Sequence, residues 1–446
     1  MQWKTFSKKQ VYDIIFPLIL EQLFMAAIGM FDVVMVSGIG ENAISAISLV
    51  DFINQLINSV LTALATGGAI VCSQYIGRKK VEDARNGAQH LTAIVGAAGF
   101  LFMAVCLILQ AQILRALYRV LEPDVMNYAK QYFTLTAIGY PFVALFCSSA
   151  AIMRVLGFTK VSFKNSAVMN VLNIALNALF IFVFHWGVIG AGLASLLSRA
   201  IISLVLFARL YKVDDMLNLK PVYQWRLNAQ TTGSILQYAV PTSVESSLFY
   251  VGRLLVQSVV TSYGTAAIAA NAVSLAIAEV LHMPGAGVGI AMITIIGRCI
   301  GADEKQEARD YATYLLKLVY VVQGIACAVS AVFAAQLAGL YNLSPETLRL
   351  AVTMLRTHAL VCALIWPLGF TVSNVIKSAG DVRFTMVVSF ASMWGCRLGG
   401  SYLFGWMFPQ LGIMNVWLAM YLDWAVRGGL YLHRFLSTKW LNKKAK

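Results

Sequence analysis

Two carboxylic acids, Glu21 and Asp32, lie in the first long apolar segment of the sequence. They are eleven positions apart, which is close to three helical turns, so both side chains face one side of a helix. An ionisable group inside a membrane span costs about 2.5–3.5 kcal/mol on insertion scales, so such a group is a candidate for binding a proton or a cation. We favour this role for Asp32, whereas Glu21 also fits a buried hydrogen-bonding role near the membrane surface.

A stripe of amides follows in a later apolar segment, where Asn170, Asn173 and Asn177 have the spacing i, i+3, i+7 of one helix face. An amide stripe facing lipid is unfavourable, so this face points into protein or a water-filled cavity. Hydrogen bonding between helices is the alternative role, and Ser195 is a further polar candidate. We expect Asp32 to lie within reach of Asn173 and Asn177. There it binds a proton, or it joins amide oxygens as a ligand of Na⁺, and we expect no other metal.

The second half of the chain also carries ionisable residues inside apolar segments. We expect Glu245 to face the protein interior, near Glu279 or Arg253, because exposure to lipid is costly. His282 shares a helix face with Glu279 at the spacing i, i+3, and it is the only histidine that we place deep inside a span. Arg397, in a later segment, completes these candidates.

Two further charges, Asp423 and Arg427, are four positions apart in the last apolar segment. Opposite charges at i, i+4 are neighbours on a helix surface. We interpret them as a structural ion pair rather than a binding site.

The elements that position these residues occur twice in the sequence. The motif Pro17-Leu-Ile-Leu-Glu21 returns 224 residues later as Pro241-Thr-Ser-Val-Glu245, and the same offset pairs several Gly and Arg residues. Later in the halves, Gly157 aligns with Gly380 and Gly187 with Gly412. Matches of Pro, Glu, Gly and Arg in one order indicate a duplicated unit. The two copies differ in chemistry, because the position that corresponds to Asp32 in the second copy is Val256.

Composition places this duplicated unit in a membrane. Of the 446 residues, 59% are hydrophobic and 12% are charged, with a mean hydropathy of +0.73, whereas soluble chains are about 25% charged. The net charge of +14 comes largely from basic residues in short loops, where they set topology rather than bind nucleic acid. Seven cysteines show no metal-ligand spacing and are expected to be small core residues.

Twelve apolar segments are long enough to span a membrane. They cover approximately 11–36, 46–74, 91–113, 131–153, 163–184, 188–209, 234–260, 267–297, 313–337, 350–374, 384–406 and 411–433. We therefore expect an all-α membrane protein with an N-lobe over 1–210, a cytoplasmic linker over 211–232 and a C-lobe over 233–446. Basic loops alternate with nearly neutral ones, so both termini are predicted to be cytoplasmic. Six spans per half make the two halves parallel repeats.

The whole chain resembles the multidrug and toxic compound extrusion (MATE) family of the flippase superfamily. The resemblance is carried by the order and spacing of several motifs: Pro17-x-x-x-Glu21, Asp32-Val-Val-Met-Val-Ser-Gly-Ile-Gly40, Gln74-Tyr-Ile-Gly77, Arg154-Val-Leu-Gly157, the Asn170–Asn173–Asn177 stripe, Pro284-Gly-Ala-Gly-Val-Gly289 and Lys377-Ser-Ala-Gly380. It implies two six-helix lobes around a central cavity. It also implies export of amphipathic, often cationic drugs or metabolites in exchange for H⁺ or Na⁺, by alternating access.

Within that family the chain is similar to the DinF-like branch, in which an Asp on the first helix and an Asn/Asp pair on the fifth respond to cations. Asp32 and Asn173 match those positions, whereas Asn177 stands where the branch often has Asp, so one ionisable group is absent. The resemblance implies a monomer in the plasma membrane, with a small amphipathic substrate, a coupling cation and membrane lipid as its partners.

Other functions stay open at this point. One is a flippase for a lipid-linked saccharide or another amphipathic lipid, which a strongly cationic cavity favours. Another, from a different class, is a channel or membrane receptor. No Walker A, His-Glu-x-x-His or Gly-x-Ser-x-Gly motif occurs, so we expect no enzyme and no cofactor. The energy source is then a proton or sodium gradient, since one charge crossing 100 mV supplies about 2.3 kcal/mol.

Overall fold

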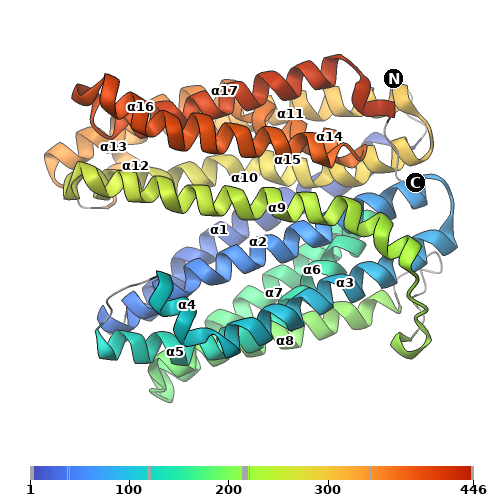
Figure 1. Ribbon diagram of the computed structural model, residues 1–446, viewed down its shortest axis with the longest axis horizontal. Coiled ribbons are helices and arrows are strands. Elements are labelled where there is room, and N and C mark those ends of the chain that lie inside the picture. The colour runs from blue at the N-terminus through green and yellow to red at the C-terminus, as the bar shows by residue number, and fades with distance from the viewer. Residues whose placement is uncertain are drawn as a thin grey trace. The chain divides into compact units, whose positions relative to one another are not determined.

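The computed structural model describes residues 5–37, 39, 41–117, 122–212, 219, 221–341 and 343–442, although the side chains of 26–34, 36–37, 41 and 442 lie outside the description. The described chain is almost entirely helical and contains no strand (Figure 1). This confirms the prediction of an all-α protein.

The first half contains eight α-helices and one π-helical turn. They are α1 (Lys8–Ser37), α2 (Glu41–Gly77), α3 (Val81–Ile108), α4 (Gln110–Leu117), α5 (Pro123–Ile138), α6 (Tyr140–Leu156), α7 (Thr159–Asn177), η1 (Ala178–Val183) and α8 (Gly187–Leu210).

The second half continues the helical pattern after a short turn, η2 (Val222–Gln224). Its elements are α9 (Ala229–Val260), η3 (Thr261–Tyr263), α10 (Thr265–Gly301), α11 (Lys305–Val332), α12 (Ala334–Gly339), α13 (Pro345–Trp366), η4 (Pro367–Thr371), α14 (Val372–Ser378), α15 (Val382–Ala391), η5 (Ser392–Gly399), α16 (Gly400–Met407), η6 (Pro409–Leu411), α17 (Met414–Leu436) and η7 (Lys439–Asn442). Joined across their short breaks, the elements of both halves coincide with the twelve spans predicted from the sequence.

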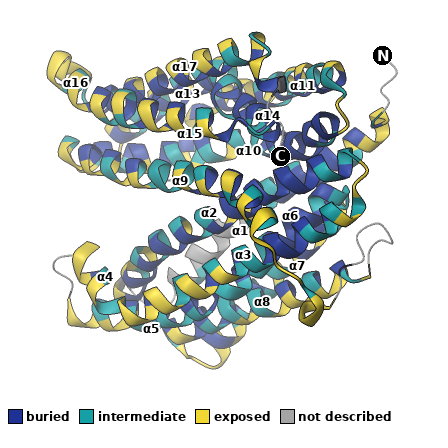
Figure 2. Cartoon of the chain, turned by 45° about the vertical axis from the view of Figure 1, so that its right-hand side comes forward, coloured by how far each residue is buried: buried dark blue, intermediate teal, exposed yellow. Residues whose placement is uncertain are grey.

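Length and apolarity support membrane insertion. Within the described ranges, seven helical stretches are long and apolar enough to cross a membrane, or eight if the pair α5–α6, bent by 42°, is one span. Among the other predicted spans, α17 carries the buried charges Asp423 and Arg427, and α15–η5–α16 carries the buried Arg397. Large apolar side chains such as Phe100, Ile108 and Val332 are exposed, as lipid contact requires. Exposed residues recur along helices of both halves (Figure 2).

The duplication is visible in the backbone. Helices α2 and α10 both have 37 residues, and α3 and α11 both have 28. Left-handed conformations recur at matching turns, with φ of 58° at Lys79 and 64° at Asp303, and 91° at Gly157 and 99° at Gly380. Glycine tolerates this region without the steric penalty of a Cβ. The Gly157–Gly380 match in the sequence therefore reflects a turn that both halves need.

By contacts, the described chain divides into two compact units. We call Phe24–Ser243 the N-unit, and Met1–Leu23 together with Val244–Lys446 the C-unit. In the C-unit, apolar residues of the first half of α1, including Val11, Ile15 and Leu18, belong to a core with α10, α11 and α14. The boundaries of these contact units differ from the lobe boundaries at 210 and 233. The lobe boundaries describe the duplicated sequence, and they stay a prediction.

The close approach of α1 to α10 inside the C-unit depends on a glycine. A Cβ added at Gly287 would lie 2.8 Å from backbone atoms of Ile19, whereas a Cβ at Gly324 on α11 meets no atom within 4 Å. We predict that Gly287→Ala lowers the unfolding free energy by about 1–3 kcal/mol through overpacking. Gly324→Ala, the matched control, raises it by up to about 1 kcal/mol through helix propensity. Thermal unfolding in detergent measures both, and equal stabilisation by the two variants would contradict the close approach.

Candidate functional site

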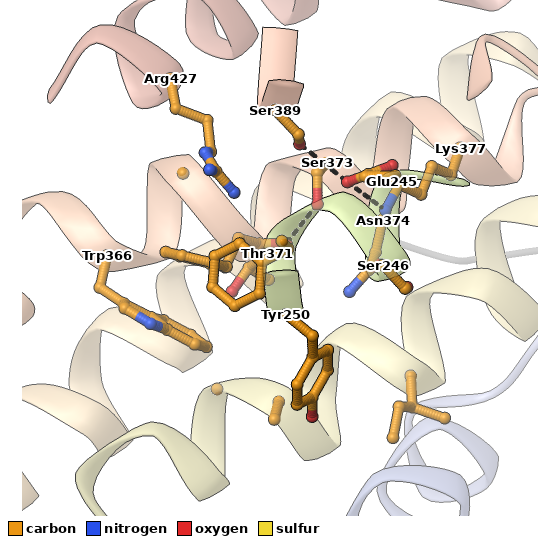
Figure 3. A pocket seen from close by; sticks show the side chains of 16 residues that line it. Glu245, Ser246, Tyr250, Trp366, Thr371, Ser373, Asn374, Lys377, Ser389 and Arg427 are labelled. Carbon is orange, nitrogen blue, oxygen red and sulfur yellow. Dashed lines mark hydrogen bonds and ion pairs between the residues drawn. The ribbon is translucent and has the colours of Figure 1, made fainter. Parts of the chain in front are cut away.

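The C-unit contains a cavity of about 300 Å³ that we call the Glu245 cavity (Figure 3). Its walls come from α9, α10, α13, η4, α14, α15 and α17, and its lining combines charged and aromatic side chains. The charged ones are Glu245, Lys377 and Arg427, and the aromatic ones are Phe249, Tyr250, Trp366 and Phe370. This volume is at the lower end of the range for small-molecule sites, and such sites are typically apolar with a few placed polar groups.

The carboxylate of Glu245 is the best-connected polar group in the cavity. Its Oε1 lies 2.9 Å from Lys377 Nζ and accepts a hydrogen bond from Ser389 Oγ at 2.8 Å, and its Oε2 accepts one from Thr385 Oγ1 at 3.3 Å. The two charged side chains are only 11% and 12% exposed. Both charges are therefore largely removed from solvent and satisfied by each other and by hydroxyls.

This geometry corrects one expectation and confirms another. Glu245 faces the interior, but its ion-pair partner is Lys377 rather than Arg253. Arg253 is eight positions further along α9, which is roughly 12 Å at 1.5 Å per residue. Lys377 was not predicted as a partner because it lies at the end of an apolar segment, where a lysine usually marks a loop. The structure places it in α14, one residue before the helix ends at Ser378.

Arg427 brings a second cation to the same cavity. Its Nη2 lies 3.0 Å from Asp423 Oδ1, which confirms the predicted ion pair between these two residues. Its guanidinium also lies over two rings of the cavity, 5.6 Å from the centroid of Phe249 and 5.1 Å from that of Phe370. Cation–π contacts of this kind hold the rings at the cavity wall. The residue predicted to be purely structural therefore also lines the site.

A further polar group lies on α9 and α10. Arg253 Nη2 is 3.0 Å from Glu279 Oε1, and His282 Nδ1 is 4.0 Å from Glu279 Oε2, as their shared helix face predicts. His282 Nε2 also lies 3.2 Å from Nε2 of His358 on α13. His358 is almost fully buried, so the expectation that His282 is the only deep histidine was wrong. The sequence around His358 includes charged residues, so its pattern did not indicate that this histidine is buried.

One group of described residues has metal-ligand chemistry. Ligand atoms of His282, His358 and Cys362 all lie within 4.8 Å of one another. The two imidazoles contact each other through their Nε2 atoms, and His282 stacks on Trp366 at 5.1 Å between centroids, whereas His358 Nδ1 has no hydrogen-bond partner among the described residues. Packing and hydrogen bonding thus account for the cluster. Arg397, the last candidate in this half, lies buried on the π-helical turn η5 and borders a separate, smaller cavity.

In the N-unit, the structure brings together the amides and hydroxyl that the sequence pointed to. Asn173 Nδ2 donates to Ser195 Oγ and to Ser198 Oγ, both at 3.4 Å, and Asn177 Nδ2 donates to Asn173 Oδ1 at 3.2 Å. Asn173 and Asn177 are both buried. Asp32 belongs to α1, but its side chain lies outside the described residues, so its approach to these amides stays a prediction.

The remaining two N-terminal candidates differ in burial. Glu21 on α1 is 1% exposed, and it belongs to the C-unit. Asn170 is half-buried. Burial this complete fits the hydrogen-bonding role that we considered for Glu21.

The sequence analysis also missed an acid in the N-unit. Asp51 Oδ1 on α2 accepts hydrogen bonds from Asn54 Nδ2 and from the Tyr132 hydroxyl, both at 3.1 Å. The Tyr140 hydroxyl in turn donates to Asn54 Oδ1 at 2.9 Å. An acid inside the predicted span 46–74, three positions before an asparagine, was the available signal.

Comparison with known proteins places this geometry in context. A protein-family model described as MatE matches the chain twice, over residues 17–179 and 241–403, and the two matches start 224 residues apart. An uncharacterized transporter YisQ of Bacillus subtilis is 25% identical, over 99% of this chain and 96% of the relative. A probable multidrug resistance protein NorM of Thermotoga maritima is 23% identical, over 97% and 93%. The human multidrug and toxin extrusion protein 1 is 24% identical, over 96% and 74%.

Solved structures share the fold at low identity. A multidrug resistance MATE family transporter of the MOP superfamily in an outward-facing conformation has a TM-score of 0.89 at 20% identity, covering 97% of this chain and 96% of that one. A MOP superfamily transporter from Pyrococcus furiosus, described as having a binding pocket of reverse polarity, has a TM-score of 0.90 at 20% identity, covering 98% and 97%.

The Glu245–Lys377 pair gives a stability prediction. Removing one member of a buried pair leaves the other charge uncompensated and typically costs about 3–5 kcal/mol. We predict a loss of this order for Lys377→Met, and a smaller loss for the double variant Glu245→Gln/Lys377→Met, in which neither charge remains. Unfolding in detergent measures this cycle. The control is Lys317→Met, which removes an exposed lysine of α11. The single variant Glu245→Gln completes the cycle. If the double variant loses as much unfolding free energy as the two single variants together, the two charges do not interact.

Proposed function

Because this chain belongs to the MATE family of transporters, we propose that it exports small amphipathic molecules in exchange for H⁺ or Na⁺ by alternating access. The family assignment makes it a multi-pass membrane transporter. The substrate class, the coupling ion, the plasma membrane location and the cytoplasmic placement of both termini are parts of the proposal. The relatives named multidrug resistance protein support the export of drugs.

The observation that carries the proposal is a buried carboxylate–ammonium pair in the wall of an aromatic cavity. Phe249, Phe370 and Trp366 offer flat apolar faces, which accept many planar molecules without a fixed hydrogen-bond pattern. Glu245 supplies a negative charge for a cationic substrate, provided that Lys377 releases it. Binding of substrate and closure of the ion pair then exclude each other.

This exclusion supplies a coupling mechanism in the C-unit. A proton on Glu245 neutralises the carboxylate and removes its attraction to Lys377, so protonation favours the arrangement in which the pair is open. A cationic substrate favours the ionised carboxylate. Proton and substrate therefore compete for one group, and such competition between two ligands is the thermodynamic requirement for exchange transport.

The N-unit offers a second coupling site. Asn173, Asn177 and Ser195 form a buried polar cluster, and Asp32 lies on the apolar helix that the sequence predicts to face it. In that arrangement Asp32 is the titratable member and the amide oxygens are hard ligands suited to Na⁺. Exchange of the cation at Asp32 would bias the N-unit between two packings.

The deciding experiment uses purified protein in liposomes loaded with the cationic dye ethidium. An imposed proton gradient or sodium gradient should drive dye movement against its own gradient, and comparison of the two identifies the coupling ion. Dye movement that merely follows its own gradient would indicate a channel, and absence of dye movement under both gradients would reject drug export.

For the C-unit, we predict that Glu245→Gln reduces gradient-driven dye export by about tenfold or more. A loss of about 1.4 kcal/mol in the free energy that couples proton binding to dye binding produces this ratio. The amide still accepts hydrogen bonds from Ser389 and Thr385, which offsets part of the cost of leaving Lys377 unpaired, but it no longer takes up a proton. Unfolding in detergent establishes that the variant is folded before export is compared. Glu346→Gln removes an exposed acid of α13 and serves as the control. If Glu245→Gln exports the dye at the wild-type rate, Glu245 has only a structural role.

For the N-unit, we predict that Asp32→Asn abolishes uphill export while ethidium binding, measured by fluorescence anisotropy, is retained. The asparagine keeps the shape of the side chain and removes its only titratable group. Asp124→Asn, which changes an exposed acid of α5, is the control. Unchanged uphill export in Asp32→Asn would move the coupling site to Glu245.

A further inference from the structure

A second cavity in the C-unit, which we call the Arg397 cavity, has a volume of about 70 Å³. One water needs about 10–15 Å³ on this measure, so the space exceeds that of a single water severalfold. It lies between α9, α10, η5 and α17. Its lining residues are Arg253, Val256, Gln257, Val260, Asn271, Leu275, Arg397, Val416, Trp417 and Met420.

Arg397 is a buried cation that has no counter-ion among the residues that the structure describes. Its side chain forms no ion pair within 4.0 Å among the described residues, and its Nε has no hydrogen-bond partner. The residue is 8% exposed, and a guanidinium stays charged in proteins. Two nearby acids, Glu279 and Asp423, are already paired with Arg253 and Arg427. Three arginines against two acids leave one net positive charge beside the cavity.

A tryptophan fixes the polarity of the neighbouring amide. Trp417 Nε1 lies 3.0 Å from Asn271 Oδ1. An indole N–H can only donate, so it occupies the carbonyl oxygen of Asn271 and leaves the amide NH₂ as the group that can face the cavity. Arg253, Arg397 and Asn271 thus all offer donors, and the lining includes no Asp or Glu. A donor-rich cavity beside an unpaired guanidinium selects an anion.

The repeat gives this cavity a counterpart in the first half. The 224-residue offset pairs Val256 with Asp32. Offsets of 223 at Gly157–Gly380 and 225 at Gly187–Gly412 bracket the match of Arg397 with Asn173. Both Val256 and Arg397 line the cavity. The positions that hold an acid and an amide in the first half therefore hold a valine and a cation in the second, so the polarity of the charge is inverted.

We propose that the Arg397 cavity binds the carboxylate of an amphipathic substrate, with Arg397 as its main partner and the Asn271 amide as a second donor. A guanidinium presents paired N–H donors that match a carboxylate. The remaining wall, which includes Leu275, Met420 and Val256, is apolar and suits the few carbon atoms next to that carboxylate, since the cavity is too small for a whole drug-sized molecule. The inference rests on the proposed export function in naming a substrate class, but its test measures binding and does not need transport.

The test compares rhodamine B, which has a free carboxylate, with its ethyl ester, which keeps the same cationic ring system. Fluorescence anisotropy with purified protein in nanodiscs gives both affinities. Wild type should bind the acid about tenfold more tightly than the ester, the ratio expected for one charge-assisted hydrogen bond. Arg397→Gln should bring the ratio close to one by weakening the acid alone. Arg356→Gln, which removes an exposed arginine of α13, should keep the wild-type ratio.

A second variant covers the case that Arg397→Gln fails to fold. Asn271→Asp keeps an oxygen acceptor for Trp417 and places a carboxylate beside Arg397, so it supplies the missing counter-ion within the protein. It should remain folded and lose the preference for the acid. Equal wild-type affinities for acid and ester would overturn the proposal, as would a preference that survives both variants.

Two further arms identify the source of any failure. Adding sodium chloride to a buffer free of carboxylates tests an inorganic anion, and a chloride effect on rhodamine binding without discrimination between acid and ester would overturn the carboxylate assignment. Gradient-driven export of the ester from liposomes tests the transporter itself. Export of the ester together with absent discrimination would reject this inference and leave the proposed function standing.

Discussion

A charge inside a membrane protein needs its compensation inside the protein, and this requirement governs the C-unit. Close to its two cavities, the described residues include four cations, Lys377, Arg253, Arg397 and Arg427, and three acids, Glu245, Glu279 and Asp423. These acids form three ion pairs, and each pair either connects two helices or stabilises one helix face. The remaining cation sits where a ligand can reach it. Charge pairing thus determines both the packing of the unit and the kind of molecule that each cavity accepts.

Periodicity and repetition in the sequence predicted much of this arrangement. Helix-face spacing placed Asn173 beside Asn177 and Glu279 beside His282, because contacts three or four residues apart depend only on the helix itself. The repeat matched turns such as Gly157 and Gly380, where a left-handed backbone constrains the residue type. Ser195, which was also predicted, lies on α8 and contacts Asn173 on α7, and only a short connection separates these two helices. Predictions of this kind succeed because they concern local geometry or geometry that the chain uses twice.

Contacts between distant segments were not predictable in this way. Lys377 reaches Glu245 across 132 positions, and nothing in its local pattern distinguishes it from a loop lysine. The partnership of His282 with His358 and the orientation of Asn271 by Trp417 likewise depend on which helix faces meet. The π-helical turns η4 and η5 were also missed, although each rotates cavity residues relative to the preceding helix. Periodicity identifies a buried face but does not specify which face lies opposite.

The exchange of helix ends between the two contact units has a consequence for biosynthesis. Residues 1–23 leave the ribosome before α10, α11 and α14, yet the core that buries Val11, Ile15 and Leu18 is built from those later helices. The N-unit in turn is completed only when the opening of α9, up to Ser243, has been made. Neither half of the duplicated sequence is therefore a self-sufficient folding piece. If the chain were cut at the central linker, the first fragment would carry a helix end that belongs to the C-unit, and the second would carry one that belongs to the N-unit. The two fragments would therefore have to be co-expressed to assemble the protein.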